Sequence, residues 1–419
     1  MKSKLFEERF VSFLSFNIIL IPIFLVSGPF LSDLSLSLCA LSFLLYIFFF
    51  KQISLLKNYF FVFFCFFYII ILISSLFSDN TLYSLKSSLP YIRFGLFVMC
   101  MVYVSRFDEN LFKKIFLSLS IIYMLLIFDG YLQFFTGTNI LNYQKTGVRI
   151  SSFFGDEHVL GSYLVRFLPI YIGLYLITLK NRTTNLFEKV FFIFFCLLIS
   201  GLILISGERT ALGLLILSLI FLLLFLNGFK KIKLTFITLL IFISFISLGI
   251  NKNIFNRLVI ETKNQIITED KIYFFGQRRH EYAQVSINIF KENIFFGSGP
   301  KTYRIKSKDE KFKISELSWN THPHNIYFQL LSETGVFGTI LVLTLFIYIV
   351  LFVLKTSFKN KIKYFKIDDN INICVGIAII INLFPLIPSG NFFNNWMSII
   401  FFYPIGIFFA FTHKINLKN

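Results

Sequence analysis

Long apolar runs are the feature of this sequence that most limits what it can fold into. A helix needs roughly 20 mainly apolar residues to cross the hydrocarbon core of a bilayer. Only 15% of the residues are charged, whereas about 25% is usual for a water-soluble domain. This composition excludes a soluble enzyme and predicts an all-α integral membrane protein with about twelve transmembrane helices. The runs lie near 11–28, 30–50, 59–77, 88–104, 115–134, 160–178, 189–206, 210–227, 233–250, 336–354, 371–388 and 397–412.

The distribution of lysine and arginine predicts the orientation of these helices. Short loops rich in basic residues stay on the cytoplasmic side of a membrane. With the N-terminus inside, the inner segments hold 21 basic residues, and the short outer loops and helix ends hold six. Both termini are then cytoplasmic, and the two long polar interruptions lie on the same outer face. The first run is expected to be a membrane anchor and not a cleaved signal peptide, because many runs follow it.

We divide the chain into three parts on this basis. Residues 1–250 are expected to form transmembrane helices 1–9 with short loops and an outer segment near 135–159. Residues 251–323 form a long outer loop, and residues 324–419 form a helix with a histidine motif and transmembrane helices 10–12. The loop holds thirteen basic and eight acidic residues, which suit a solvated loop beside anionic headgroups. An amphipathic helix that can lie on the membrane surface is expected from His280 to Asn293.

Charge and cysteine usage limit the ligands that the chain can bind. The formal net charge of +18 suits nucleic acid, an acidic lipid surface or a phosphorylated substrate. Because the basic residues flank apolar runs, we expect membrane lipids and a phosphorylated substrate as partners, and no nucleic acid. The five cysteines all fall inside apolar runs, without the paired spacing of a metal site. We therefore expect no disulfide framework, no metal and no cofactor.

The most informative stretch reads THPHNIYFQLLSETGVFG and ends at Gly338. Pro323 suits a first helical position, so a helix is expected to begin around residues 322–324. At about 100° per residue, Gly335 and Gly338 return to the direction of His324. These three residues would then share one face, where the glycines would let another helix approach closely.

A histidine at the start of that helix suits proton transfer. The positive end of the helix dipole disfavours imidazolium, so His324 is expected to remain neutral and able to accept a proton. His322 lies at or before the expected helix start and need not point toward the same site. The alternative is that His324 only caps the helix or forms a hydrogen bond at a helix interface.

Several arginines lie in the segments expected on the outer face. Arg209 is in a short turn after the seventh run, Arg278 and Arg279 precede the expected surface helix, and Arg149 is in the shorter outer segment. A planar guanidinium suits the oxygens of a pyrophosphate better than a lysine does. Outer-face arginines together with a neutral histidine are what transfer from a lipid pyrophosphate would require.

Arg166 is the one arginine expected deep within a span, about two turns into the sixth helix. A charged group at that depth is costly and commonly lines a cavity. The alternative is an ion pair with Asp156 or Glu157.

At these positions the sequence resembles the O-antigen ligases and the related O-antigen polymerases. His324 and Asn325, followed after nine residues by Gly335 and then by Gly338, match the His-Asn signature of this family. The resemblance extends from about residue 130 to 355 and implies a C-type glycosyltransferase-like membrane fold.

Further segments are similar to the same family. These are the stretch from Arg279 through Tyr282 to GSGPKTYR, the stretch RISSFFGDEHVLGSYL and the turn that carries Arg209. The turn departs from the family pattern, because Glu208 stands where a small hydroxyl residue is common. Arg278 beside Arg279 leaves that assignment ambiguous by one residue.

The resemblance implies an enzyme at the periplasmic face of a bacterial inner membrane. Its donor would be an undecaprenyl-pyrophosphate-linked glycan, and neither a nucleotide sugar nor a metal is implied. A ligase would hand the glycan to lipid A–core, whereas a polymerase would hand it to another lipid-linked repeat unit. We favour the ligase.

The resemblance also implies roles for individual residues. His324 would be the catalytic base, and Arg209 and Arg279 would hold the pyrophosphate with help from Arg149 or Arg166. Gly335 and Gly338 would serve helix packing. The full set of expected substrate-binding residues is Arg209, Arg279, Arg278, Arg149, Arg166 and Asn325.

Two other classes of protein compete with this hypothesis. A transporter of lipid-linked sugars would place polar groups and broken helices near the bilayer midplane, often in two related halves. Here the candidates gather at the outer face, apart from Arg166, and the halves differ in loop length. A non-catalytic assembly subunit would leave the His-Asn signature unexplained.

Overall fold

The computed structural model describes residues 2–180, 185–250, 252–267, 273, 276–362 and 366–416. Three basic residues that contributed to the predicted orientation, Arg182, Lys363 and Lys418, lie outside the described residues. So do parts of the predicted outer loop, namely 251, 268–272 and 274–275.

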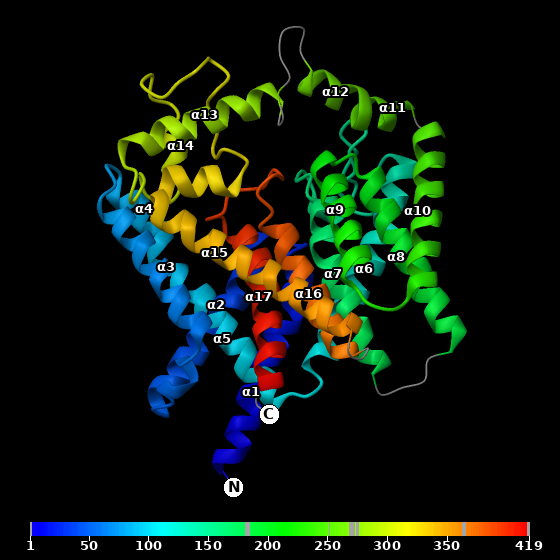
Figure 1. The fold of residues 1–419 in the computed structure, drawn as a ribbon, viewed down its shortest axis with the longest axis horizontal. Helices are drawn as coiled ribbons and strands as arrows, with labels where there is room; N and C mark the ends of the chain where they lie inside the picture. The colour runs from blue at the N-terminus through cyan, green and yellow to red at the C-terminus, as the bar shows by residue number, and fades with distance from the viewer. Residues whose placement is uncertain are drawn as a thin grey trace. The chain divides into compact units, whose positions relative to one another are not determined.

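Helices make up most of the described chain (Figure 1). Isolated bridges between extended residues join Thr138 to Gln144 and Thr146 to Arg149. Each of the twelve predicted apolar runs overlaps a helix. The α-helices are α1 (Lys2–Phe24), α2 (Pro29–Phe49), α3 (Tyr59–Leu76), α4 (Thr81–Ser88), α5 (Ile92–Phe107), α6 (Leu111–Thr136), α7 (Leu160–Leu179), α8 (Leu186–Ile205), α9 (Arg209–Phe225), α10 (Lys230–Ile250), α11 (Lys252–Phe255), α12 (Glu261–Ile266), α13 (Gln277–Glu292), α14 (Tyr303–Lys306), α15 (Ile326–Ile362), α16 (Ile367–Asn382) and α17 (Asn395–Asn416). The 3-10 helices are η1 (Ile53–Leu56), η2 (Leu89–Tyr91) and η3 (Ser152–Phe154), and η4 (Asn256–Ile260) is a π-helix.

Eight helical stretches in the described part of the chain are long and apolar enough to cross a membrane. The apolar helix α9 has 17 residues and α16 has 16, so both are shorter. These helices support a multi-pass membrane protein, whereas twelve spans, the outer loop and the orientation of the termini stay predictions. The eight stretches are Pro29–Phe49, Tyr59–Leu76, Thr81–Phe107, Leu111–Thr136, Leu160–Leu179, Leu186–Ile205, Ile326–Lys359 and Asn395–Thr412.

The chain forms two compact units, each built from three separate segments. The first unit consists of Met1–Ser32, Ser105–Thr262 and Ile349–Asn382. The second unit consists of Asp33–Val104, Lys263–Tyr348 and Leu383–Asn419.

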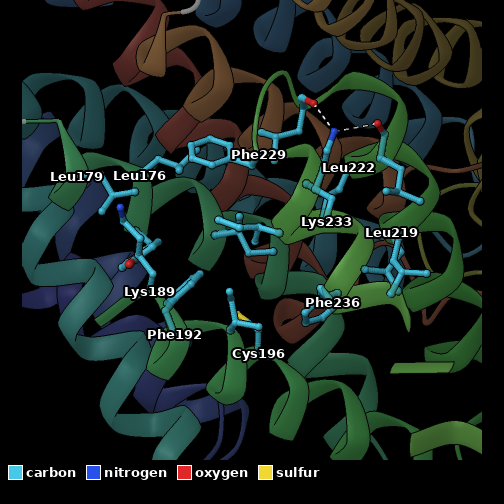
Figure 2. Close-up of a pocket in the computed structure, with 17 residues that line it drawn as sticks. Leu176, Leu179, Lys189, Phe192, Cys196, Leu219, Leu222, Phe229, Lys233 and Phe236 are labelled. Atoms are coloured by element: carbon cyan, nitrogen blue, oxygen red, sulfur yellow. Dashed lines mark hydrogen bonds between the residues drawn. The ribbon is translucent and has the colours of Figure 1, made fainter. Parts of the chain in front are cut away.

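Helix α7 is central to the first unit, where it packs against α6, α8, α9 and α16. The contact with α16 is close, because a Cβ atom built on Gly173 would lie 2.9 Å from the Cβ of Cys374. Helices α7 to α10 also surround an apolar cavity of about 240 Å³ (Figure 2). Lys233 lies at its edge and donates from Nζ to the backbone oxygens of Leu226 (2.7 Å) and Leu223 (3.2 Å), which are left unpaired where α9 ends.

The second unit combines an aromatic core with the expected amphipathic helix. Rings from α3, α5, η2 and α17 pack together, and Tyr91 contacts both Phe94 and Phe402. Helix α13 confirms the helix expected within the long polar interruption. It buries Val285 and Ile289 against the segment that follows it in the chain.

Candidate active site

The His-Asn motif lies in a loop and not at the start of a helix, which corrects the sequence-based prediction. Helix α15 begins at Ile326, and His324 has a φ of 56°, a left-handed conformation that is uncommon for residues other than glycine. The loop after α16 holds this conformation in place, because the Ser389 N–H donates to the His324 carbonyl oxygen at 2.9 Å. Pro323 therefore precedes the helix by three residues and is not its first residue.

Asn325 caps the helix. Its Oδ1 accepts hydrogen bonds from the backbone N–H groups of Tyr327 (3.0 Å) and Phe328 (3.2 Å), as an N-cap side chain does. Its Nδ2 donates to the backbone oxygen of Pro385 at 2.7 Å. Because both polar ends of this side chain bind backbone groups, the geometry gives Asn325 a structural role instead of the expected contact with substrate.

Helix α15 is broken at Gly335, which overturns the prediction that His324, Gly335 and Gly338 share one helix face. Gly335 has φ 63° and ψ −163°, a combination that is essentially restricted to glycine. A loop and not a helix packs against it, since a Cβ atom there would lie 2.4 Å from the Phe295 carbonyl oxygen. The three atoms nearest to a Cβ atom on Gly338 all belong to the Thr334 side chain, with Oγ1 at 2.2 Å. Gly335 thus allows the close approach of a loop and not of a helix, whereas the helix-packing role of Gly338 stays a prediction.

A chain of hydrogen bonds fixes the protonation of His324. The Asn320 amide is oriented by its Oδ1, which accepts from the Thr321 N–H at 2.6 Å. This orientation directs Asn320 Nδ2 to the His324 Nε2 atom, 3.2 Å away. An amide NH₂ group only donates, so Nε2 of a neutral His324 carries a lone pair and Nδ1 carries the proton.

The second histidine of the motif lies directly beside the first. The ring centroids of His322 and His324 are 4.1 Å apart, and the Tyr282 ring from α13 is 5.9 Å from His324. Sequence reasoning did not include His322 in the site, because it assumed a helix that begins around residues 322–324, whereas both histidines precede the helix and His324 is left-handed.

Both imidazoles are held neutral. Burial lowers the pKa of His324 to about 4, with the positive charge of Arg279 acting in the same direction and a hydrogen bond with the Ser389 backbone acting against it. Burial also lowers the pKa of His322 to about 3, with His324 and Arg304 acting in the same direction and a hydrogen bond with the Ser389 backbone acting against it. The predicted neutrality of His324 thus has burial as its main cause, and the helix start is not involved.

Arg279 lies in the first turn of α13, and its charge acts on the His324 ring. Arg279 and the adjacent Arg278 are both exposed on this turn, so exposure does not distinguish them. The electrostatic contact with His324 favours Arg279 over Arg278 as the arginine of this histidine group, which we define as Arg279, Asn320, His322 and His324.

A second group of candidate residues lies within the first unit. Arg209 opens α9 directly after a tight turn in which Gly207 has a φ of 70°. Its Nη1 donates to Thr262 Oγ1 at 3.4 Å. Arg149 lies against the same turn, since a Cβ atom on Gly207 would be 3.5 Å from the Arg149 Cγ.

Arg257 joins these two arginines and was not singled out from the sequence. It lies in the π-helix η4, a kind of distortion that is frequent at functional sites. Its Nε donates to the Gly207 carbonyl oxygen at 2.9 Å, and its Nη1 is 3.6 Å from Glu261. Burial lowers the pKa of Arg149, and the nearby charge of Arg257 adds to this effect. We call Arg149, Arg209 and Arg257 the arginine group.

Glu208, the departure from the family pattern, has a structural explanation. The residue is 7% exposed, and its carboxylate accepts hydrogen bonds from the N–H groups of Gly161 (2.7 Å) and Ser162 (3.1 Å) at the start of α7. Burial raises its pKa to about 7, while these bonds and the charges of Arg149 and Arg166 act in the opposite direction. Glu208 thus fixes the arginine-bearing turn to a helix N-terminus, where a carboxylate is favoured.

Arg166 is packed inside the first unit. It is 3% exposed, and its Nη1 donates to Asn382 Oδ1 of α16. This contact replaces the expected pairing with Asp156 or Glu157. So little exposure leaves no surface for a ligand, so we assign Arg166 to the packing of α7 against α16 and not to donor binding.

The chemistry available to the two groups differs. The arginine group presents permanent cations that suit phosphate oxygens, and the histidine group presents a neutral imidazole with an available lone pair. Among the described residues, no three His, Cys, Asp or Glu side chains gather as metal ligands.

Residues 194–343 match a family model described as O-antigen ligase. The matched range contains Arg209, Arg257, Arg279 and His324. The match confirms the resemblance that the His-Asn signature predicted and supports the O-antigen ligase family, and with it a glycosyl-transferring activity of the ligase or polymerase type. No curated protein sequence matches the chain.

Proposed function

We propose that this protein transfers a glycan from undecaprenyl pyrophosphate to a sugar hydroxyl of lipid A–core at the outer face of a bacterial inner membrane. The observation that carries this proposal is the state of His324: a neutral imidazole whose Nε2 lone pair is held by the Asn320 amide. A general base needs a lone pair that a substrate hydroxyl can reach.

In the proposed reaction, the acceptor hydroxyl displaces the Asn320 amide and donates its proton to His324 Nε2. The acceptor oxygen forms a bond to the anomeric carbon of the donor glycan. The bond from that carbon to the phosphate oxygen breaks, and the pyrophosphate leaves with the electron pair. Arg279, whose charge acts on the His324 ring, offsets the negative charge that grows on the leaving group. The arginine group of the first unit is proposed separately to bind phosphate oxygens of the donor.

The low pKa of His324 fits a base that becomes active when the donor binds. Without the donor, burial and Arg279 keep the ring neutral across physiological pH. A bound pyrophosphate brings negative charge that counters Arg279, and a nearby negative charge raises the pKa of an imidazole. The base therefore strengthens when its substrate is present.

The choice between ligase and polymerase is tested by offering both acceptors to the purified full-length protein. An undecaprenyl-pyrophosphate-linked glycan is incubated either with lipid A–core or with a second lipid-linked unit, and the extended acceptor is identified by mass spectrometry. We expect extension of lipid A–core. Extension of the lipid-linked unit alone would identify a polymerase, and movement of the lipid across vesicles without extension would identify a transporter.

The base is tested by His324→Ala in the same assay. Removal of a general base costs on the order of 100- to 10,000-fold in turnover, whereas donor binding should persist because the arginines provide it. Normal turnover, or a loss of donor binding that matches the loss of activity, would show that His324 is not the base.

A further inference from the structure

The apolar cavity of the first unit lies at the end of α9 that is farthest from the arginine group. Helix α9 starts at Arg209 and has 17 residues, so at roughly 1.5 Å per residue its two ends are about 25 Å apart. The last turns of α9, from Leu219 to Leu226, line the cavity together with residues of α7, α8 and α10. The proposed transfer does not use this end of the helix.

The walls of the cavity suit a hydrocarbon chain. Aliphatic and aromatic side chains make up most of the lining, and Figure 2 shows Phe192, Leu219 and Phe236 around it. An apolar cavity of this kind does not hold ordered water, so it favours an apolar occupant. Two of the lining side chains, Leu223 and Ile232, are exposed. The cavity therefore opens to the surface between the end of α9 and the start of α10.

The same end of the cavity is strongly basic. Lys189 and Lys233 line the cavity, and Figure 2 shows them on different sides of it. Each is the fourth residue of its helix, where the positive end of the helix dipole adds to the charge of the side chain. The first turns of α8 and α10 together hold four lysines and one carboxylate, namely Lys189, Lys230, Lys231, Lys233 and Glu188. The local charge therefore favours an anion.

Two polar groups that line the cavity have hydrogen-bonding capacity left. Lys233 Nζ donates to the backbone oxygens of Leu226 and Leu223, and an ammonium group carries a third N–H. Tyr175 also lines the cavity, and its buried Oη has no hydrogen-bond partner among the described residues. Buried hydroxyls are almost always paired, so this one calls for a contact from outside the protein. An occupant of the cavity should therefore combine an apolar chain with acceptor oxygens.

We propose that this cavity binds one acyl chain of an anionic phospholipid, whose phosphate contacts Lys189 and Lys233. The donor lipid fits less well, because its pyrophosphate would lie with the arginine group at the other end of α9. The distribution of basic residues predicts that the cavity end of the helices is cytoplasmic, and the cytoplasmic leaflet carries a negative surface potential. This site is independent of the proposed transfer, so either can fail without the other.

The proposal is tested by photolabelling of the purified full-length protein in detergent. The probe is phosphatidylglycerol with a diazirine in one acyl chain, and mass spectrometry locates the labelled residues. We expect labels on cavity residues such as Leu219 and Phe236, and competition by unlabelled phosphatidylglycerol but not by phosphatidylcholine. Equal competition by phosphatidylcholine would overturn the anionic site. Displacement of the probe by undecaprenyl pyrophosphate would also overturn it, because the cavity would then belong to the donor chain.

A substitution that fills the cavity tests the binding of the acyl chain. Leu219→Trp places a larger side chain in the cavity and should abolish labelling of the other cavity residues. Leu224→Trp is the matched control, because Leu224 is 65% exposed on the same helix and does not line the cavity. Labelling of the cavity that persists in a folded Leu219→Trp variant would overturn the proposal. Thermal unfolding establishes that each variant is folded.

A charge substitution tests the headgroup contact and does not depend on the cavity-filling variant. Lys189→Gln removes one basic residue near the phosphate and should weaken phosphatidylglycerol binding about fivefold. Lys113→Gln is the matched control, because Lys113 is exposed on α6 and does not line the cavity. An unchanged affinity of the Lys189→Gln variant for phosphatidylglycerol would overturn the proposed contact with the phosphate.

Discussion

The arginine group and the histidine group solve opposite electrostatic problems. In the first unit, three guanidinium groups remain cationic although like charges lie nearby, because arginine keeps its proton under all ordinary conditions. In the second unit, burial keeps two imidazoles uncharged. The comparison separates binding from proton transfer: permanent charge suits a leaving group, and a neutral lone pair suits a hydroxyl.

The backbones of the two groups also differ. The arginine group is fixed by regular elements and their ends, with Arg209 opening α9 and Arg257 bonded to the Gly207 carbonyl oxygen. The histidine group is held by irregular backbone and by hydrogen bonds of the Asn320 side chain. We therefore expect substitutions in the arginine group to change donor affinity, and substitutions that alter the loop to change turnover.

The largest expected effect within this comparison is on donor binding. Arg257→Gln removes a charged hydrogen-bonding group worth roughly 1.5–3 kcal/mol, which corresponds to about 10- to 150-fold weaker donor binding, with kcat at saturating donor little changed. The exposed Lys263→Gln serves as a charge-matched control and should leave the dissociation constant unchanged. A fall in kcat without a change in donor affinity would contradict the division of roles.

The break in α15 provides the next test. Gly335→Ala places a methyl group against the Phe295 backbone in a conformation closed to alanine, so thermal unfolding in detergent should show a loss of roughly 1–3 kcal/mol. Gly213→Ala is the matched control, because nothing lies within 4 Å of its added methyl group. Equal stability of the two variants would mean that the break is not required.

Glu208, which fixes the turn that carries Arg209, should make the stability of the protein depend on pH. Its carboxyl titrates near 4.5 when unfolded and near 7 when folded, so the folded state holds the extra proton between these values. Its contribution to stability therefore falls as pH rises through this window, by at most about 1.4 kcal/mol per pH unit. Glu208→Gln should flatten the slope of unfolding temperature against pH. An unchanged slope would assign the proton to another group.

The smallest expected effect concerns the coupling between Arg279 and His324. Because Arg279 lowers the pKa of His324, Arg279→Gln should raise that pKa above its value of about 4. The base must be unprotonated to work, so the acid limb of the pH–rate profile should move to higher pH by less than about one unit. Arg278→Gln should leave the limb in place. A shift of the acid limb in the Arg278 variant alone would assign the coupling with His324 to Arg278.

Sequence reasoning was most reliable where one local property decides the structure. Long apolar runs located the helices, and the amphipathic spacing of Val285 and Ile289 predicted α13. It was wrong about the start of α15, because the left-handed His324 and the cap formed by Asn325 depend on the loop after α16. Local sequence cannot report a partner sixty residues away.

The candidate site shows the same limit. His324 and Arg209 were found through motifs, since each lies in a recognisable stretch. Arg257 was not found, because its place beside Gly207 depends on the fold of η4 and not on any spacing along the chain. His322 was set aside by an argument that assumed a regular helix, and the helix begins later.

The loop that packs against the break in α15 is held by main-chain atoms. The N–H groups of Ser298 and Val336 donate to the carbonyl oxygens of Ser332 and Ile294, at 2.9 and 2.8 Å. These bonds use peptide groups that every residue carries, so the bonds themselves do not depend on the side chains of residues 294–298. Side chains add contacts of their own, since Phe295 and Phe296 contact Phe337 and Ser298 Oγ donates to the Ser332 carbonyl oxygen. At Gly297 and Gly335 a side chain would instead meet main-chain atoms of the opposite segment, 2.5 and 2.4 Å from its Cβ. Saturation mutagenesis of residues 294–298 and 335 should therefore show the least tolerance at these two glycines.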